Sequence, residues 1–208
     1  MTVNSNAAVG LFFEATPRPG HLEHYFSFVE RLKPELANHE GLLWLKRYRA
    51  LFDDYSLLSH QLWDSEQSIE IWRKNKAHRL AQTAGIKTHF KDYRIRLGKK
   101  LRNWPADDKS ELENCSPKDS NSLLLSVHSK APILGSIPEE YGSSKTTYAD
   151  LVTSKQFITL LEPNDLTHAT ALAAGINPNI IDKIELFLIS RNYSMTDRSQ
   201  SPSAKHHE

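Results

Sequence analysis

Cysteine is almost absent from the chain. Cys115 stands alone among 208 residues, so no intramolecular disulfide framework can form. No run approaches the roughly 18 apolar residues that a membrane-spanning helix needs. Residues 1–8 lack the basic and apolar regions of a secretory signal peptide. We therefore predict a cytoplasmic protein without a membrane partner.

The sequence also lacks a dense basic run and any common cofactor motif. Residues 1–105 contain 17 Lys and Arg against 11 Asp and Glu, whereas residues 106–208 contain 9 against 14. The basic residues alternate along predicted strands or stand on helix faces, so we predict no nucleic-acid partner. Two halves of opposite charge can attract each other. There is no Gly-rich phosphate loop, paired CxxC or HExxH, so we predict neither a metal nor a cofactor.

What the first half does contain is a regular succession of strand and helix signals. Apolar residues recur at a spacing of two along the predicted strands and at helical spacing along the predicted helices. Within residues 8–98 the order is strand, helix, strand, strand, helix, strand, over residues 9–15, 21–36, 43–50, 56–63, 65–85 and 93–97. This order indicates an α+β fold of the ferredoxin-like βαββαβ type.

The second half looks like a degenerate copy of the first. Residues 99–121 are polar and read as a linker. Within residues 122–195 the segment FITLLEPNDLTHATALAA parallels LLSHQLWDSEQSIEIWRK as strand, acidic turn and capped helix, with Asn164 or Asp165 as the cap. Only a turn fits between residues 131 and 144, so we predict tandem ferredoxin-like modules whose second copy lacks its first helix. Residues 196–208 carry no core residue, which predicts a disordered tail.

Specific residues in the first half resemble a known family. The stretch WDSEQSIEIWRKNKAHRLAQTAG, followed by the strand YRIRLG, is similar to the second half of antibiotic biosynthesis monooxygenase (ABM) modules. Those modules have an aromatic strand end, an acidic turn, a helix with a Trp and a His six residues later, and an arginine-bearing last strand. The stretches EATPRPGHLEHY and HEGLLWLKRYR fit the first half of the pattern. The resemblance covers residues 8–98 well and residues 121–195 weakly.

The resemblance implies a dimeric α/β barrel, formed within one chain or by a homodimer, with a pocket between the sheet and its helices. It also implies oxidation of an electron-rich aromatic or polyketide-like small molecule by dioxygen without metal or flavin. Such chemistry requires a group that removes a proton, stabilisation of the anion and exclusion of water.

His78 and Trp72 are the catalytic candidates. A histidine has an unperturbed pKa near 6.5, which suits proton transfer close to neutral pH. On one continuous helix, six residues correspond to about 240° net, so the two side chains are expected to point in different directions. The structural alternative for His78 is a partly exposed polar residue.

Substrate contacts are predicted for aromatic and basic side chains of the hairpin, the first helix and the last strand. Aromatic residues in these places pack in cores and interfaces as often as they bind ligands. Arg94 and Arg96 share one strand face, where they can offset an anionic substrate, be solvated, or bridge to the partner module. The predicted substrate-binding set is Trp44, Tyr48, His60, Trp63, Tyr25 and Arg94.

Two other functions remain open from the sequence. Haem-binding relatives use an asparagine on the first strand and a histidine nine or ten residues after the helix tryptophan. Here Phe13 occupies the strand position and Ala81 and Gln82 stand nine and ten after Trp72, so haem is the less favoured alternative. A non-catalytic binding or assembly module is the third possibility, because a copy without a helix loses its pocket and can only complete the first module.

Overall fold

The computed structural model describes residues 8–53, 55–104, 122–133 and 145–202. The first half contains four strands and three helices: β1 (Val9–Pro17), α1 (Leu22–Ala37), β2 (Leu42–Ala50), β3 (Leu57–Trp63), α2 (Glu66–Lys74), α3 (Lys76–Ala84) and β4 (Phe90–Trp104). The second half contains β5 (Ser122–Ser129), β6 (Lys145–Asp150), β7 (Phe157–Leu161), α4 (Leu166–Gly175) and β8 (Ile181–Ser194). The predicted α+β class is correct.

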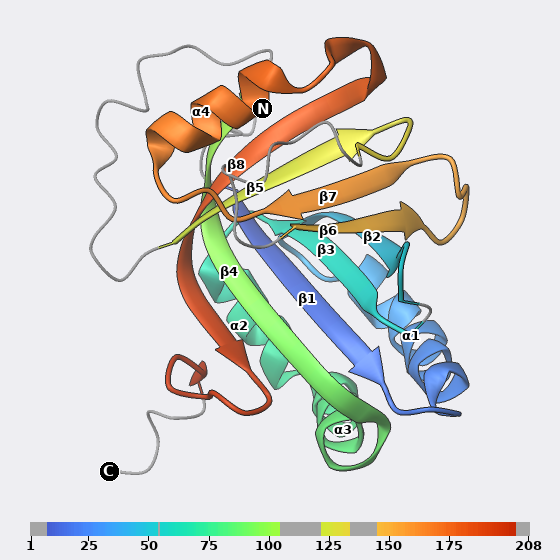
Figure 1. Ribbon diagram of the computed structural model, residues 1–208. Helices are drawn as coiled ribbons and strands as arrows, with labels where there is room; N and C mark the ends of the chain where they lie inside the picture. Colours follow the sequence, from blue (N-terminus) through green and yellow to red (C-terminus); the bar gives the residue numbers. More distant parts are fainter. Residues whose placement is uncertain (1–7, 54, 105–121, 134–144, 203–208) are drawn as a thin grey trace.

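All eight of these strands form one closed antiparallel barrel, in the order β1-β3-β2-β6-β7-β5-β8-β4 (Figure 1). The strand order is the same in both halves: the first strand lies between the third and the fourth, and the second strand pairs with the third. The halves join where β2 pairs with β6 and β4 pairs with β8. The sequence left open whether a barrel needs two chains, and here one chain closes it.

Strand alternation divides each half into an inner and a helix-covered face. Phe12, Leu124 and Phe187 belong to an apolar cluster at the middle of the barrel interior. On the outside, α1–α3 cover the first half and α4 covers the second, and Figure 1 shows α4 well apart from α1 and α3. The core beneath α4 is aliphatic and includes Ala169 and Leu172.

Three sequence-based boundaries need correction. The predicted linker began at residue 99, but β4 continues to Trp104 because its backbone pairs with β8 and Leu101 is buried against the α4 core. The predicted tail is ordered up to residue 202, where a turn packs back onto β4. The rest of the linker, the rest of the tail and residues 134–144, where the first helix of the second module was predicted to be missing, lie outside the described residues.

The predicted helix after β3 is in fact two helices. α2 ends at Lys74 and α3 begins at Lys76, because the backbone of Asn75 is extended (φ −54°, ψ 133°). A π-helical turn at Gly85–His89 follows α3. No helix in the described part of the chain is long and apolar enough to cross a membrane.

Candidate active site

Two small cavities, each of about 130 Å³, lie between the sheet of the first half and its helices. The same five side chains line both cavities: Phe13, Gln61, Trp72, His78 and Gln82. Phe13 and Gln61 come from the helix-facing side of β1 and β3, whereas the other three come from α2 and α3. The remaining walls are largely apolar, which is typical of small-molecule sites with a few convergent polar groups.

Trp72 and His78 lie against each other because the helix breaks between them. Their rings are stacked with centroids 4.6 Å apart and an interplanar angle of 19°. Asn75 fixes the break: its side-chain oxygen accepts a hydrogen bond from the His78 backbone N–H at 3.0 Å, as an N-cap does. Its side-chain nitrogen donates to Glu35 on α1 at 2.7 Å. The predicted divergence of the two side chains was wrong, since it assumed one continuous helix.

The hydrogen bonding of His78 defines which ring nitrogen can act as a base. Nδ1 lies 3.0 Å from the carbonyl oxygen of Trp72, and a carbonyl can only accept, so Nδ1 carries the proton. In the neutral ring, Nε2 is therefore unprotonated. Burial lowers the pKa of His78 and outweighs the hydrogen bond to Trp72, which acts in the opposite direction. At neutral pH the ring is thus an uncharged base at the wall of both cavities.

Three further polar side chains line this space: Gln61 on β3, Arg47 on β2 and Tyr25 on α1. The Gln61 side-chain nitrogen donates to Ser59 Oγ at 3.1 Å, and its oxygen accepts from Trp63 Nε1 at 2.9 Å. Tyr25 on α1 lines the same cavity as Arg47. Burial raises the pKa of Tyr25, while the hydrogen-bonded Arg47 guanidinium opposes this effect. These contacts hold the polar groups in fixed positions at the edge of an apolar space.

The predicted site residues fall into separate places. Trp72, His78 and Tyr25 line the helix-side cavities. Trp63 faces the same side but is fully buried beneath them. The other hairpin residues do not join them, because strand alternation turns Trp44, Tyr48 and His60 to the opposite face, inside the barrel.

His60 occupies a closed, largely aromatic position in the barrel interior. It is fully buried, stacks on Phe12 at a centroid distance of 4.3 Å and lies 5.6 Å from the ring of His128. Neither of its ring nitrogens has a hydrogen-bond partner among the described residues. Burial, followed by the charge of His128, holds the pKa of His60 well below its usual range. The ring is therefore neutral, and its surroundings are those of a core residue.

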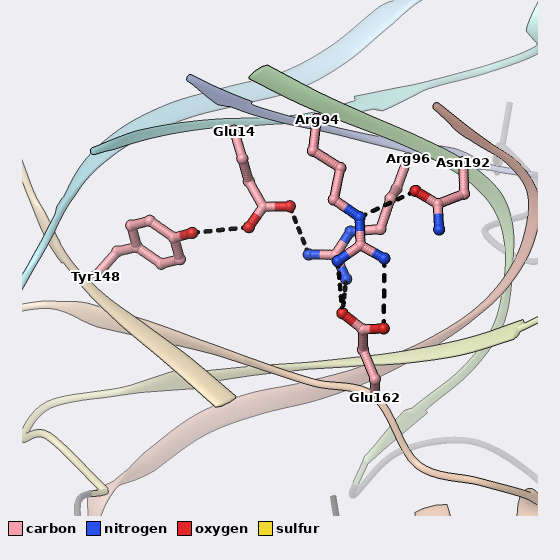
Figure 2. Close-up of polar contacts among 6 residues, drawn as sticks. All are labelled: Glu14, Arg94, Arg96, Tyr148, Glu162 and Asn192. Carbon is pink, nitrogen blue, oxygen red and sulfur yellow. Dashed lines mark hydrogen bonds and ion pairs between the residues drawn. The ribbon is translucent and has the colours of Figure 1, made fainter. Parts of the chain in front are cut away.

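Arg94 and Arg96 bridge the two halves of the barrel (Figure 2). Both guanidinium groups contact Glu162, each with an N–O distance of 2.8 Å. Arg96, which is 2% exposed, also donates to Glu14 at 2.7 Å. Tyr148 from the second half donates to the other oxygen of Glu14 at 2.8 Å. Of the three readings given for these arginines, bridging to the second module is the one that these contacts bear out.

A larger cavity of about 560 Å³ opens at this end of the barrel. Glu14, Arg94, Tyr148, Asp53 and Asp92 are among its lining residues. The two arginines already contact carboxylates, and no predicted catalytic residue lies here. Within the described ranges, no group of three or more His, Cys, Asp or Glu residues could hold a metal ion.

The sequence did not single out several residues of the helix-side cavities. Gln61 shares a strand face with Ser59 and Trp63, so alternation from Trp63 could have identified it. Arg191, Tyr193 and Pro202 also line one cavity, although they come from β8 and the segment that follows it. Their contribution depends on the pairing of β4 with β8, which no local pattern reveals.

Comparison with known proteins finds a family match in the first half. Residues 8–84 match the family model described as antibiotic biosynthesis monooxygenase. A curated protein of Pyricularia oryzae, named jasmonate monooxygenase ABM, is 27% identical over 113 residues, which are 54% of this chain. The match spans about half, 53%, of that relative's length.

Solved structures with similar chains share little sequence with this one. PA3566 from Pseudomonas aeruginosa is 16% identical, with a TM-score of 0.43 over 48% of this chain and 99% of that one. Rv0793 from Mycobacterium tuberculosis is 14% identical, with a TM-score of 0.41 over 50% of this chain and 99% of that one. A protein from Fusobacterium nucleatum is 10% identical, with a TM-score of 0.44 over 89% and 94%. The fold described above rests on the strand pairing of this chain alone.

Proposed function

From the match of residues 8–84 to the family model described as antibiotic biosynthesis monooxygenase, we propose that the chain oxidises a small aromatic or polyketide-like molecule with dioxygen. The proposed site is the pair of helix-side cavities. The observation that carries the proposal is the stacked Trp72–His78 pair, in which the bond to the Trp72 carbonyl leaves His78 Nε2 as the unprotonated nitrogen. The proposed reaction needs no bound cofactor.

In the proposed reaction, His78 Nε2 removes the hydroxyl proton of an electron-rich phenol or enol. The resulting anion gives one electron to dioxygen, and the carbon radical and superoxide then combine to form a C–O bond. Protonation of the peroxide by the His78 imidazolium gives a hydroperoxide. Loss of its remaining C–H proton breaks the O–O bond and releases hydroxide, which takes up a proton and leaves as water. The carbon that is a CH₂ group in the keto form of the substrate thus becomes C=O. Dioxygen accepts the four electrons that the carbon loses.

The proposed roles of the other side chains follow from their positions. Trp72 covers one face of the His78 ring and keeps it in place, which matters because misplacing a catalytic group by about 1 Å can cost a hundredfold in rate. Gln61 and Gln82 can donate to the developing oxyanion through their amide N–H groups. Phe13 and Ile95 supply apolar surface for the substrate ring and exclude water.

A haem group fits this space poorly. Ala81 and Gln82 stand nine and ten residues after Trp72, where haem-binding relatives have a histidine. Phe13 lies at the wall of both cavities, in the place where haem-binding relatives have an asparagine. We therefore assign no step to haem.

For the second half we propose a non-catalytic role, as a diverged copy that closes the barrel. Its strand order matches that of the first half, and Asp165 caps α4 at the position equivalent to Ser65 on α2. The space beneath α4 is filled by aliphatic side chains that include Leu125, Leu161 and Leu172. A solid core of this kind supports assembly rather than ligand binding.

Dioxygen consumption by the purified, chelator-treated protein tests the oxygenase proposal. The substrates are small phenols and anthrone-type compounds, and the variants are His78→Gln and, as a matched control on α4, His168→Gln. We expect uptake with at least one substrate, a loss of about 100-fold in kcat for His78→Gln, and unchanged uptake for His168→Gln. Equal uptake by all three proteins, or uptake that disappears on chelation, would contradict the proposal.

A further inference from the structure

The segment after β8 folds back onto the first half of the barrel. The backbone N–H of Met195 donates to the carbonyl of Tyr93 at 3.0 Å. The Arg198 guanidinium donates to the hydroxyl of Tyr93 and, at 3.1 Å, to Ser201 Oγ. Ser201 is buried. These contacts hold the turn at residues 195–202 against β4, and Figure 1 shows β8 running beside β4 to reach it.

This C-terminal turn forms part of the wall of the proposed site. Pro202 lines one of the helix-side cavities together with two residues of β8, Arg191 and Tyr193. Arg198 and Ser201 line a further cavity of about 130 Å³ that adjoins it. The two cavities share five lining residues: Phe13, Arg73, Gln82, Ile95 and Tyr193. The match to the family model ends at residue 84, so this wall comes from residues outside the match.

The adjoining cavity has a positive lining. Its charged residues are two arginines, Arg73 from α2 and Arg198 from the turn, and its described lining contains no carboxylate. The hydrogen bonds of Arg198 go to neutral hydroxyl groups. Burial raises the pKa of Tyr193, while the nearby charges of Arg73 and Arg198 oppose the rise. An anionic group placed here would therefore meet positive charge and hydroxyl donors.

Three carboxylates close to this region have contacts of their own. Glu66 pairs with Arg191 at 3.1 Å, and Glu70 pairs with Lys74 at 2.7 Å and also interacts electrostatically with Arg73. Asp197, the chain neighbour of Arg198, accepts hydrogen bonds from Ser199. None of the three lines the adjoining cavity. The charge is thus distributed along the space, with an apolar and neutral part beside Trp72 and His78 and a cationic end beside the turn.

We propose that residues 191–202 complete the site of the first half and select small organic acids, with the anionic group at Arg73 and Arg198 and the apolar body against Phe13 and Ile95. This inference rests on the proposed site and names its ligand class. It also gives the second half a part in the specificity of the first, because β8 carries the turn into position.

A matched pair of fluorescent probes tests the inference. 8-Anilinonaphthalene-1-sulfonate and N-phenyl-1-naphthylamine share one aromatic frame, but only the first carries a sulfonate. We expect the sulfonate probe to bind wild-type protein about tenfold more tightly, since charge-assisted hydrogen bonds are stronger than neutral ones. Arg198→Gln and Arg73→Gln should bring the two dissociation constants close to equality, whereas Arg198→Lys should keep most of the preference.

Lys33→Gln serves as the matched control, because Lys33 is an exposed cation on α1, away from the cavities. It should leave the probe ratio unchanged. Circular dichroism of each variant distinguishes loss of fold from loss of charge. Equal affinities in wild-type protein, a ratio that Arg198→Gln does not change, or no binding of either probe would overturn the inference. Probe binding requires no turnover, so a sulfonate preference without dioxygen consumption would reject the oxygenase proposal and leave this inference intact.

Discussion

From their third strands onward, the two halves of the barrel follow the same plan up to one position and then differ. Ser65 caps α2 and Asp165 caps α4, and Ile69 and Trp72 are buried as Ala169 and Leu172 are, each pair being 100 residues apart. The halves diverge at Asn75 and Gly175. Asn75 starts a second helix, α3, whereas the chain leaves α4 at Gly175 for β8. α3 brings His78 and Gln82 over the sheet, so the extra helix accounts for the cavity.

The same comparison applies to the side chains beneath the helices. Trp72 and Gln61 of the first half correspond to Leu172 and Leu161 of the second. A stacked aromatic ring and a fixed amide border a hollow space in one half, and aliphatic side chains fill the equivalent space in the other. The comparison teaches that one strand order can support either a binding site or a solid closure, depending on a few helix-facing residues.

The largest effect on activity is expected from exchanging the two equivalent residues, Trp72 and Leu172. Trp72→Leu should lower kcat for dioxygen uptake by about 100-fold, because His78 loses the ring that positions it. The reverse change, Leu172→Trp, should leave uptake intact but cost about 1–3 kcal/mol in the free energy of unfolding by overpacking a filled core. Uptake assays and urea titrations followed by circular dichroism measure both. Equal effects of the two changes on dioxygen uptake would contradict the claim that only the first half holds the site.

A second prediction concerns the contact between the halves. Arg96→Met removes a buried cation that contacts Glu14 and Glu162. The loss should cost about 3–5 kcal/mol in unfolding free energy, since two partly buried carboxylates lose a partner. Urea denaturation at pH 7 provides the measurement. Lys130→Met, which removes an exposed cation paired with Asp182 on β8, is the control and should cost well under about 1 kcal/mol.

A third prediction concerns Asn75, where the halves diverge. Asn75→Ala should destabilise the start of α3 by about 1 kcal/mol and lower kcat more than it raises KM, because Asn75 is a positioning residue for His78. Asn75→Asp should recover most of the loss, since a carboxylate also caps a helix. A loss of stability in Asn75→Ala with kcat unchanged would mean that the cap has no role in positioning His78.

The smallest effect is expected from the neutral histidines inside the barrel. The pKa values of His60 and His128 lie below 6.5 in the folded state. The unfolded state therefore binds more protons below about pH 6.5, and stability falls as the pH drops through that value. His60→Phe should reduce this slope and raise stability at pH 7 by about 1 kcal/mol, because two unpartnered ring nitrogens disappear. An unchanged slope between pH 7 and 5 would show that His60 does not titrate on unfolding.

The sequence predicted which segments form strands and helices better than it predicted which face each side chain occupies. Hydrophobic spacing predicted the order of strands and helices along the chain, and of the two predicted caps for α4, Asn164 or Asp165, the structure has Asp165. The break at Asn75 was missed because Arg73 and Lys74 before it and Lys76 and Ala77 after it favour one continuous helix. Its cause is tertiary, since the Asn75 side chain bonds Glu35 on α1 as well as capping α3.

The candidate site was predicted only in part for a related reason. Trp72, His78 and Tyr25 were identified, but Trp44, Tyr48 and His60 were placed with them by residue type although alternation turns them inward. Arg191, Tyr193 and Arg198 could not be found from local patterns, because the pairing of β4 with β8 brings them to the site across about 100 residues of sequence.

Hydrogen exchange with and without bound 8-anilinonaphthalene-1-sulfonate tests most directly the central claim that the hollow helix side of the first half is the ligand site. The account predicts slower exchange in Glu66–His89 and at residues 191–202, with no change in α4. Slower exchange in α4, or slower exchange only at the end of the barrel that holds Glu14 and Tyr148, would contradict it.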